Sequence, residues 1–236
     1  MPVPIKTTRK TARFRRVLLL SLAIALAAPA AFAGDDKDID KINGSITAEA
    51  GQDYGNLETV NGSINLESGA RIQGAETVNG SIRVADNVQA RSLSTVNGSI
   101  RGAGKAQLSG GAETVNGSVF FDRGSRIGED VTTVNGAIGL VETEVGGNIE
   151  TVNGDITVGI GSHVHGHVKV EKPTSSWMPI NINRRKPRIV IGPNAVVDGP
   201  LIFEREVTLY VHASARVGAI TGATAVKYDT ARAPQD

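Results

Sequence analysis

The sequence contains no cysteine and few aromatic residues. Its 236 residues include five Phe, three Tyr and one Trp, together 4% of the chain. The absence of cysteine excludes disulfides, thiolate metal sites, cysteine nucleophiles and the lipidated cysteine of a bacterial lipoprotein. A core with so few aromatics has to be filled by small and β-branched side chains. The 28 Gly, about 12% of the chain against roughly 7% on average, predict frequent backbone corners.

The N-terminal segment has the pattern of a secretory signal peptide. Residues 1–33 contain six basic residues and no acidic one. The apolar run Val17 to Ala28 is shorter than the about 20 residues that a transmembrane helix needs. Ala31-Phe32-Ala33 is an A-x-A cleavage site, so we predict cleavage before Gly34 and a periplasmic or secreted protein of a bacterium. An uncleaved anchor is the alternative. Arg15-Arg16 leaves twin-arginine export open beside ordinary secretion.

Cleavage at this position changes the charge of the chain. The predicted mature chain keeps 19 of the 25 basic residues and all 24 acidic ones, a net charge of −5. Residues 34–168 carry 9 basic and 18 acidic residues, a net charge of −9, which argues against general binding of this main body to nucleic acid. The sequence also contains no nucleophile elbow, phosphate-binding loop or H-E-x-x-H motif.

A five-residue word of the type V-N-G-S-I is repeated seven times. Its asparagines are 18, 18, 18, 19, 19 and 18 residues apart, and a Thr precedes the word in six copies. The asparagines are Asn43, Asn61, Asn79, Asn97, Asn116, Asn135 and Asn153. A fixed period of this length is the signature of a repeat architecture.

The repeat favours a solenoid over an array of hairpins. Asn-Gly between apolar residues is typical of a two-residue hairpin, but Thr-Val is too short to be one of its two strands. In the second copy the apolar residues fall into three clusters, Val60, Ile64 with Leu66, and Ile72 with Ala75. We therefore predict an all-β fold, a single-stranded parallel β-helix (β-solenoid) with about 18 residues and three short strands per coil.

The Asn-Gly pair is then expected at a corner of each coil. Asn tolerates the left-handed backbone region and Gly enters it freely. Coils about 4.8 Å apart would let the seven Asn side chains bond to one another as a structural ladder. If Val60 faces inward, Thr59 and Asn61 face outward, and a repeated Thr-x-Asn surface makes ice binding a remote alternative.

A second word, small-x-apolar-x-Gly, extends the repeat beyond the asparagines. It occurs at Ser162-His163-Val164-His165-Gly166 and again at Ala195-Val196-Val197-Asp198-Gly199. The predicted organisation begins with a signal peptide over residues 1–33 and a solenoid with seven V-N-G-S-I coils over residues 34–168. A basic Pro-containing loop (169–190), further solenoid coils (191–229) and a flexible tail (230–236) follow.

These words also resemble two known families. The V-N-G-S-I copies over residues 39–160 resemble secreted putative-adhesin β-solenoid proteins of bacteria, a family largely without assigned chemistry. Ile191-Gly192-Pro193-Asn194-Ala195 and the residues after it, over about 189–222, resemble bactofilins, the polymer-forming cytoskeletal proteins. Both resemblances imply a β-helix, with right-handed coils preferred, and the second implies end-to-end polymerisation. The signal peptide departs from bactofilins, which are cytoplasmic.

Three of the four histidines form the most distinctive candidate site. His163, His165 and His167 alternate along one segment, so we expect them on one face of a strand, with Val164 and Val168 toward the core. Imidazoles at i and i+2 can chelate one Zn, Cu or Ni ion. We expect the set to lack a nearby carboxylate. The alternative is an exposed polar strand face.

Two charged patterns suggest other roles. The loop 169–190 combines the only Trp, Trp177, with basic residues, and is a candidate contact for envelope glycans or lipid headgroups, or else a solvated loop. Its basic residues are Lys169, Lys172, Arg184, Arg185, Lys186 and Arg188. Acids also recur before the Thr, at Glu58, Glu76, Glu113 and Glu150, which we interpret as a solubilising face.

We thus expect a non-enzymatic structural or adhesin-like scaffold at the bacterial cell envelope, without a cofactor. The alternative is a carbohydrate-binding or carbohydrate-cleaving β-helix. Self-association is expected through the ends of the solenoid, where unpaired strand edges lie. Acidic residues crowd the N-terminal end and oppose it: Asp35, Asp36, Asp38 and Asp40.

Overall fold

The computed structural model describes residues 37–173 and 185–234, and every regular element in these ranges is a β-strand. Since no helix occurs there, none of the described residues forms an apolar helix that could cross a membrane. The strands belong to one compact unit and pair in parallel, each with its counterpart one coil away. The predicted all-β parallel solenoid is confirmed. The predicted signal peptide lies outside the described residues.

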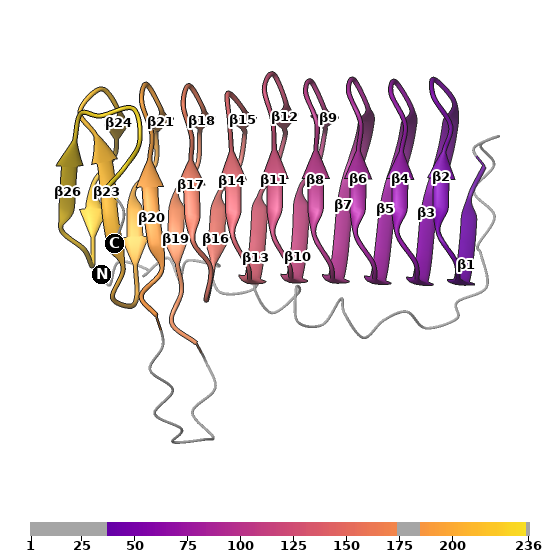
Figure 1. Cartoon of the computed structure of the whole chain (residues 1–236), viewed down its shortest axis with the longest axis horizontal. Coiled ribbons are helices and arrows are strands. Elements are labelled where there is room, and N and C mark those ends of the chain that lie inside the picture. The colour runs from indigo at the N-terminus through magenta and orange to yellow at the C-terminus, as the bar shows by residue number, and fades with distance from the viewer. Residues whose placement is uncertain (1–36, 174–184, 235–236) are drawn as a thin grey trace, which may run out of the picture. The chain divides into compact units, whose positions relative to one another are not determined.

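Each coil contributes strands to three faces, and the coils lie side by side from β1 to β26 (Figure 1). Face 1 is a ten-stranded sheet with one strand from each coil. Its strands in spatial order are β2 (Ile46–Ala48), β4 (Ile64–Leu66), β6 (Ile82–Val84), β8 (Ile100–Gly102), β11 (Val119–Phe121), β14 (Ile138–Leu140), β17 (Ile156–Val158), β20 (Arg188–Ile191), β23 (Thr208–His212) and β26 (Ala225–Tyr228).

A second, 16-stranded sheet forms faces 2 and 3. Three long strands run through both faces: β3 (Asp53–Asn61), β5 (Arg71–Asn79) and β7 (Gln89–Asn97). Face 2 continues with β9 (Gln107–Leu108), β12 (Arg126–Ile127), β15 (Glu144–Val145), β18 (His163–Val164), β21 (Val196–Val197) and β24 (Arg216–Val217). Face 3 has β1 (Ile39–Asn43) before them and then β10 (Ala112–Asn116), β13 (Val131–Asn135), β16 (Ile149–Thr151), β19 (Val168–Val170), β22 (Leu201–Phe203) and β25 (Ile220–Thr221).

The first 19-residue spacing places its extra residue at the corner between faces 2 and 3. Ala90 pairs with Leu108, 18 residues on, whereas Leu93 pairs with Ala112, 19 residues on. The added residue therefore lies between Leu108 and Ala112, where β9 ends and β10 begins. In the coil after β7 this corner divides one long strand into two, β9 on face 2 and β10 on face 3.

The core consists of columns of like residues, one from each coil. The first inward position of face 1 is aliphatic and buried in every coil but the last, at Ile46, Ile64, Ile82, Ile100, Val119, Ile138, Ile156, Ile189 and Leu209. Leu66, Ile72 and Ala75 are buried as predicted. Stacked aliphatic side chains, most of them β-branched or small and the rest mainly leucine, thus fill the interior, which explains why few aromatics suffice.

The orientation predicted for the Thr-Val pair is wrong. Thr59, Thr77 and Thr95 are buried, whereas Val60 is half-buried and faces outward. The Thr59 hydroxyl donates to the carbonyl oxygen of Gly44 at 3.1 Å, and Thr77, Thr95, Thr114 and Thr133 bond in the same way to the glycine one coil before. Each hydroxyl thereby satisfies a corner carbonyl. An outward Thr-x-Asn surface does not exist, so the basis for ice binding is lost.

The asparagines form a continuous side-chain ladder along the corner between faces 3 and 1. In six successive links, each Nδ2 donates to the Oδ1 of the preceding Asn at 2.9–3.1 Å, from Asn61 on Asn43 to Asn153 on Asn135. Beyond Asn153 the corner is interrupted by the segment between β19 and β20. There Arg205 Nη1 donates to Asn153 Oδ1 at 2.7 Å and ends the ladder.

Glycine is required in the V-N-G-S-I words mainly because a side chain would have no space there, and less because of a positive backbone angle φ. Only the first, Gly44, has a positive φ among the seven, +105°. At Gly98 an added Cβ would collide with the carbonyl oxygen of Gly80 one coil before, and the copies at Gly62, Gly80, Gly117, Gly136 and Gly154 meet the same obstacle. The left-handed conformation that we expected for these glycines is therefore confined to the first coil.

We predict that Gly98→Ala destabilises the protein by about 1–3 kcal/mol, because the new methyl group would collide with the carbonyl oxygen of Gly80. Gly104→Ala is the matched control, since its Cβ would lie 3.3 Å from its nearest atoms, a tight contact that a shift of a few tenths of an ångström accommodates. Chemical denaturation of both variants measures the difference. Equal, small losses would contradict the close stacking of this corner.

The ladder gives a second prediction. Asn97→Ala removes a donor to Asn79 and an acceptor of Asn116, two hydrogen bonds at about 1 kcal/mol each. Asn43→Ala on the first coil removes only the acceptor of Asn61 and should cost half as much. If thermal unfolding shows the same shift for both variants, the asparagines do not act as a stacked ladder.

Candidate functional site

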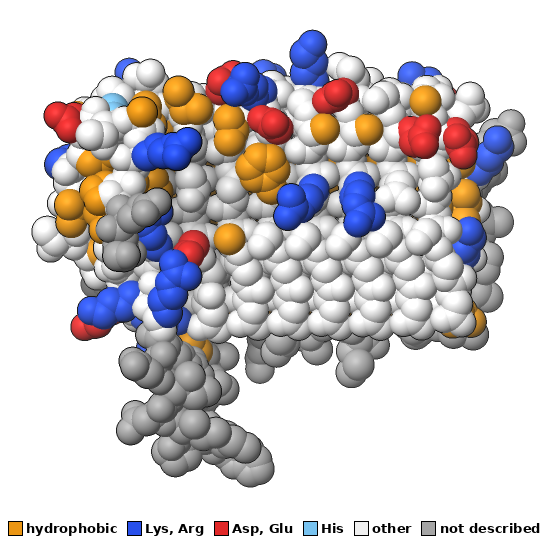
Figure 2. Space-filling model, viewed as in Figure 1, with side chains coloured by type: hydrophobic (Ala, Val, Ile, Leu, Met, Phe, Trp, Pro, Cys, Tyr) orange, Lys and Arg blue, Asp and Glu red, His pale blue; other side chains and the backbone are white. Residues whose placement is uncertain are grey.

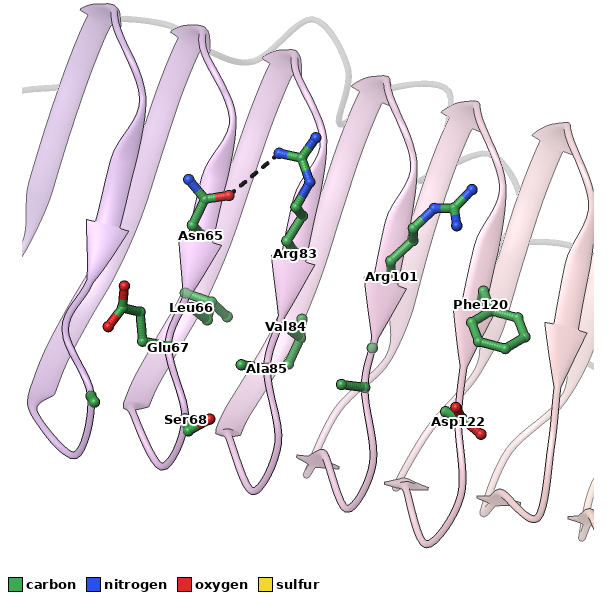
Figure 3. Close-up of a pocket in the computed structure, with 13 residues that line it drawn as sticks. Asn65, Leu66, Glu67, Ser68, Arg83, Val84, Ala85, Arg101, Phe120 and Asp122 are labelled. Carbon is green, nitrogen blue, oxygen red and sulfur yellow. Dashed lines mark hydrogen bonds between the residues drawn. The ribbon is translucent and has the colours of Figure 1, made fainter.

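An open groove of about 780 Å³ lies on the outer side of face 1, across β4, β6, β8 and β11 (Figure 3). One side of it is a row of outward residues that pair directly from coil to coil, Asn65, Arg83, Arg101 and Phe120. Neighbours in such a row are about 4.8 Å apart at the backbone. The groove was missed at the sequence level, although the residue after each V-N-G-S-I word is the one that forms this row.

Arg83 and Arg101 occupy directly paired positions on neighbouring coils of this row. Arg83 Nη1 donates a long hydrogen bond of 3.4 Å to Asn65 Oδ1, drawn in Figure 3. Neither Arg83 nor Arg101 forms an ion pair with any residue that the structure describes. Both side chains are exposed. Two adjacent positive charges without a counter-charge attract an anion that can bridge them.

Phe120 places an aromatic ring beside these cations. Its side chain is 36% exposed, and it is the only large aromatic among the exposed hydrophobic residues of the described chain. The ring lies over Gly139 of the next coil, where an added Cβ would come within 3.1 Å of it. Figure 2 shows basic and hydrophobic side chains next to one another on this side, beside a broad uncharged area. The groove thus offers a fixed apolar surface next to two cations.

The acidic residues of the groove are far apart. Glu67 and Asp122 line its edge, with Ala85 and Ala103 at the equivalent position of the coils between them. Three coil steps separate their backbones by about 14 Å. The paired carboxylates of glycoside hydrolases lie about 5–9.5 Å apart. This spacing does not favour hydrolytic chemistry in the groove.

The three candidate histidines lie in two places. His163 is in β18, and His165 follows it, with ring centroids 4.1 Å apart. His167 lies beyond the corner at Gly166 and bonds through Nε2 to Glu150 Oε1 at 2.8 Å. Our expectation that all three point together is therefore corrected to two of them.

The expectation that no carboxylate is near the histidines is also corrected, because neighbouring coils supply two. Asp198 Oδ2 lies 2.8 Å from His163 Nε2 and 3.1 Å from His165 Nδ1, and Glu144 Oε1 lies 3.1 Å from His165 Nε2. The hydrogen bond to Glu144 raises the pKa of His165, with a further contribution from Asp198. In turn, the bond to His165 lowers the pKa of Glu144, and the bond to His163 lowers that of Asp198.

The recurring acids form a row on face 3. Asp40, Glu58 and Glu76 pair directly along the sheet, and Glu113 and Glu150 continue the row beyond Ser94 and Thr132. Burial raises the pKa of Glu58, Glu76 and Glu113, and neighbouring carboxylates add to the effect. Asp40 and Glu58 are exposed and Glu76, Glu113 and Glu150 are half-buried, so the row lies on the outer side of face 3, and its interpretation as a solubilising face stays a prediction.

Four of the five described basic residues of the segment, Lys169, Arg185, Lys186 and Arg188, use their charges within the protein. Lys169 lies in β19 and pairs with Glu171 and Glu204 at 2.8 and 2.9 Å, so the loop begins later than predicted. Arg185 pairs with Asp155 and Lys186 with Glu206. Arg188 begins β20 and lies over the Tyr210 ring at 5.0 Å. The backbone N–H of Lys172 donates to Glu204. Trp177 and Arg184 lie outside the described residues.

The two ends of the solenoid differ. At the first coil, Asp38 accepts the backbone N–H of Asn56 at 2.6 Å and Ile42 is 68% exposed; Asp35 and Asp36 lie outside the described residues. At the last coil, β26 pairs with β23 alone. The tail that we expected to be loose makes contacts over residues 230–234, where Pro234 accepts a hydrogen bond from Arg188 and Ala233 packs near Tyr210 and Tyr228.

In comparisons with known proteins, no family model matches this chain, and neither a curated protein nor a solved structure matches it. The resemblances to putative adhesins and to bactofilins therefore stay predictions from short motifs, and what is established is the β-solenoid scaffold itself.

Proposed function

We propose that this protein is an exported, non-enzymatic, adhesin-like scaffold of the bacterial envelope, and that it holds acidic glycans in the groove on face 1. The observation that carries the proposal is the row Arg83, Arg101 and Phe120, which combines two cations that form no ion pair with a described residue and an exposed ring on one sheet. The sheet fixes the spacing of these groups before any ligand arrives, which lowers the entropic cost of binding.

The shape of the groove favours a polymer over a small molecule. Small-ligand pockets are concave and bury 70–90% of the ligand. This groove is open along the coils, so it suits an extended chain that contacts several coils in turn. A carboxylate of such a chain would accept paired hydrogen bonds from a guanidinium group, and a sugar ring would pack on Phe120.

Binding to a defined acidic polymer tests the groove. We expect the protein lacking residues 1–33 to bind polygalacturonate and not the neutral polymer dextran in calorimetry at low salt. Arg101→Ala should weaken binding about tenfold, the loss of a charged hydrogen bond, and reduce its salt dependence. Phe120→Ala should weaken it about fivefold and leave the salt dependence unchanged.

Arg91→Ala is the matched control, because Arg91 is an exposed arginine of β7 outside the groove. It should bind like the unmodified protein, and all variants should melt at the same temperature. Equal weakening by Arg91→Ala and Arg101→Ala would indicate unspecific charge attraction and contradict the groove. So would equal affinity for the two polymers.

Export is tested separately. Expressed with residues 1–33 in a Gram-negative host, the protein should accumulate in the periplasm or medium with the mass of a chain that begins at Gly34. Ala31→Leu with Ala33→Leu should block this processing, because the cleavage site requires small residues. A full-length protein that stays in the cytoplasm would contradict the envelope location.

A further inference from the structure

The structure brings together three potential metal ligands from two coils that the insertion between β19 and β20 separates. His163 and His165 come from the coil before the insertion, and Asp198 follows β21 in the coil after it. Asp198 Oδ2 lies 2.8 Å from His163 Nε2 and 3.1 Å from His165 Nδ1. One carboxylate oxygen therefore faces two imidazole nitrogens at once.

We propose that His163, His165 and Asp198 form a binding site for one divalent transition-metal ion, with Zn²⁺ and Cu²⁺ as the best fits. Their ligand atoms all lie within 4.8 Å of one another. Tetrahedral coordination with bonds of about 2.0 Å places ligand atoms about 3.3 Å apart, close to the spacing already present. Imidazole with one carboxylate suits such ions better than Mg²⁺ or Ca²⁺, which prefer oxygen ligands. This inference does not depend on the proposed glycan groove.

Glu144 acts as a positioning residue for this site. Its Oε1 lies 3.1 Å from His165 Nε2, so the carboxylate holds one nitrogen of the ring and aims the other, Nδ1, toward Asp198. Glu144 is itself held by Arg126, whose Nη2 lies 2.7 Å from Oε2. Carboxylates that orient ligand histidines in this way are common around metal sites and strengthen binding. The site thus draws on the coil of Glu144 as well as on the two that supply its ligands.

His167 is excluded from the site by the corner at Gly166. Its Nε2 bonds to Glu150 at 2.8 Å, and it does not belong to the group of mutually close ligand atoms. It is two residues from His165 and is therefore a matched control.

The experiment is calorimetry of untagged protein lacking residues 1–33, titrated with ZnCl₂ and with CuCl₂, together with melting curves in the presence and absence of each ion. We expect one ion per chain and a higher melting temperature with metal, because the ion binds only the folded coils. Mg²⁺ should produce neither effect. Asp198→Asn and His165→Ala should each weaken binding at least tenfold, whereas His167→Ala should bind like the unmodified protein. Glu144→Gln should weaken binding less than Asp198→Asn does.

Circular dichroism and melting of each variant without metal establish that it is folded, so that a lost site is distinguished from a lost fold. Absence of binding by the unmodified protein would overturn the proposal. So would a loss in His167→Ala equal to that in His165→Ala, or full binding by folded Asp198→Asn.

Discussion

The backbone hydrogen bonds between parallel strands hold neighbouring coils about 4.8 Å apart, and the rest of the structure depends on this spacing. At that distance every side chain lies directly against its counterpart in the next coil. A Cβ at Gly98 has no space because the carbonyl of Gly80 lies below it. The same closeness lets Asn97 bond to Asn79, and lets the Thr95 hydroxyl reach the carbonyl of Gly80. In the Thr-Val-Asn-Gly-Ser word, every residue except the outward Val is thus held by a contact with a neighbouring coil. The serine is held as well, because Ser81 Oγ accepts the backbone N–H of Ser99.

The same spacing creates candidate sites wherever the residue type changes at an outward position that is equivalent from coil to coil. Residues 18 or 19 apart in sequence become neighbours, so the groove arises from Arg83, Arg101 and Phe120 without any long loop. The cluster of His163, His165 and Asp198 arises likewise, although 33 residues separate His165 from Asp198. Changes at single column positions can therefore create new surfaces while the inward and corner columns keep the coil intact.

The repeat period and the apolar clusters were sufficient to predict the solenoid and the position of the asparagines, because both follow from residues that recur in register. The Thr-Val orientation was not predictable in the same way, since either residue fits a strand interior, and the hydrogen bond of Thr59 to the Gly44 carbonyl depends on the corner geometry. Alternation along the chain indicated the pairing of His163 with His165. Asp198 was overlooked although it holds the position of His165 in the second repeated word, a correspondence that the insertion obscures. Arg83, Arg101 and Phe120 of the groove form no motif along the sequence, because only the pairing of successive coils brings them together.

The most direct test of the stacked-coil account is a pair of distances between spin labels, because a chain without cysteine can be labelled at chosen positions. Thr47, Asn65 and Thr157 belong to one outward row of face 1, and Thr47 and Thr157 are exposed. Double electron–electron resonance between labels on Thr47→Cys and Thr157→Cys should give about 29 Å, six coil steps of about 4.8 Å, and the pair Asn65→Cys with Thr157→Cys should give one step less. A hairpin array with two strands per repeat would place the first pair about 58 Å apart. That longer distance would contradict the stacked coils and both candidate sites that depend on them.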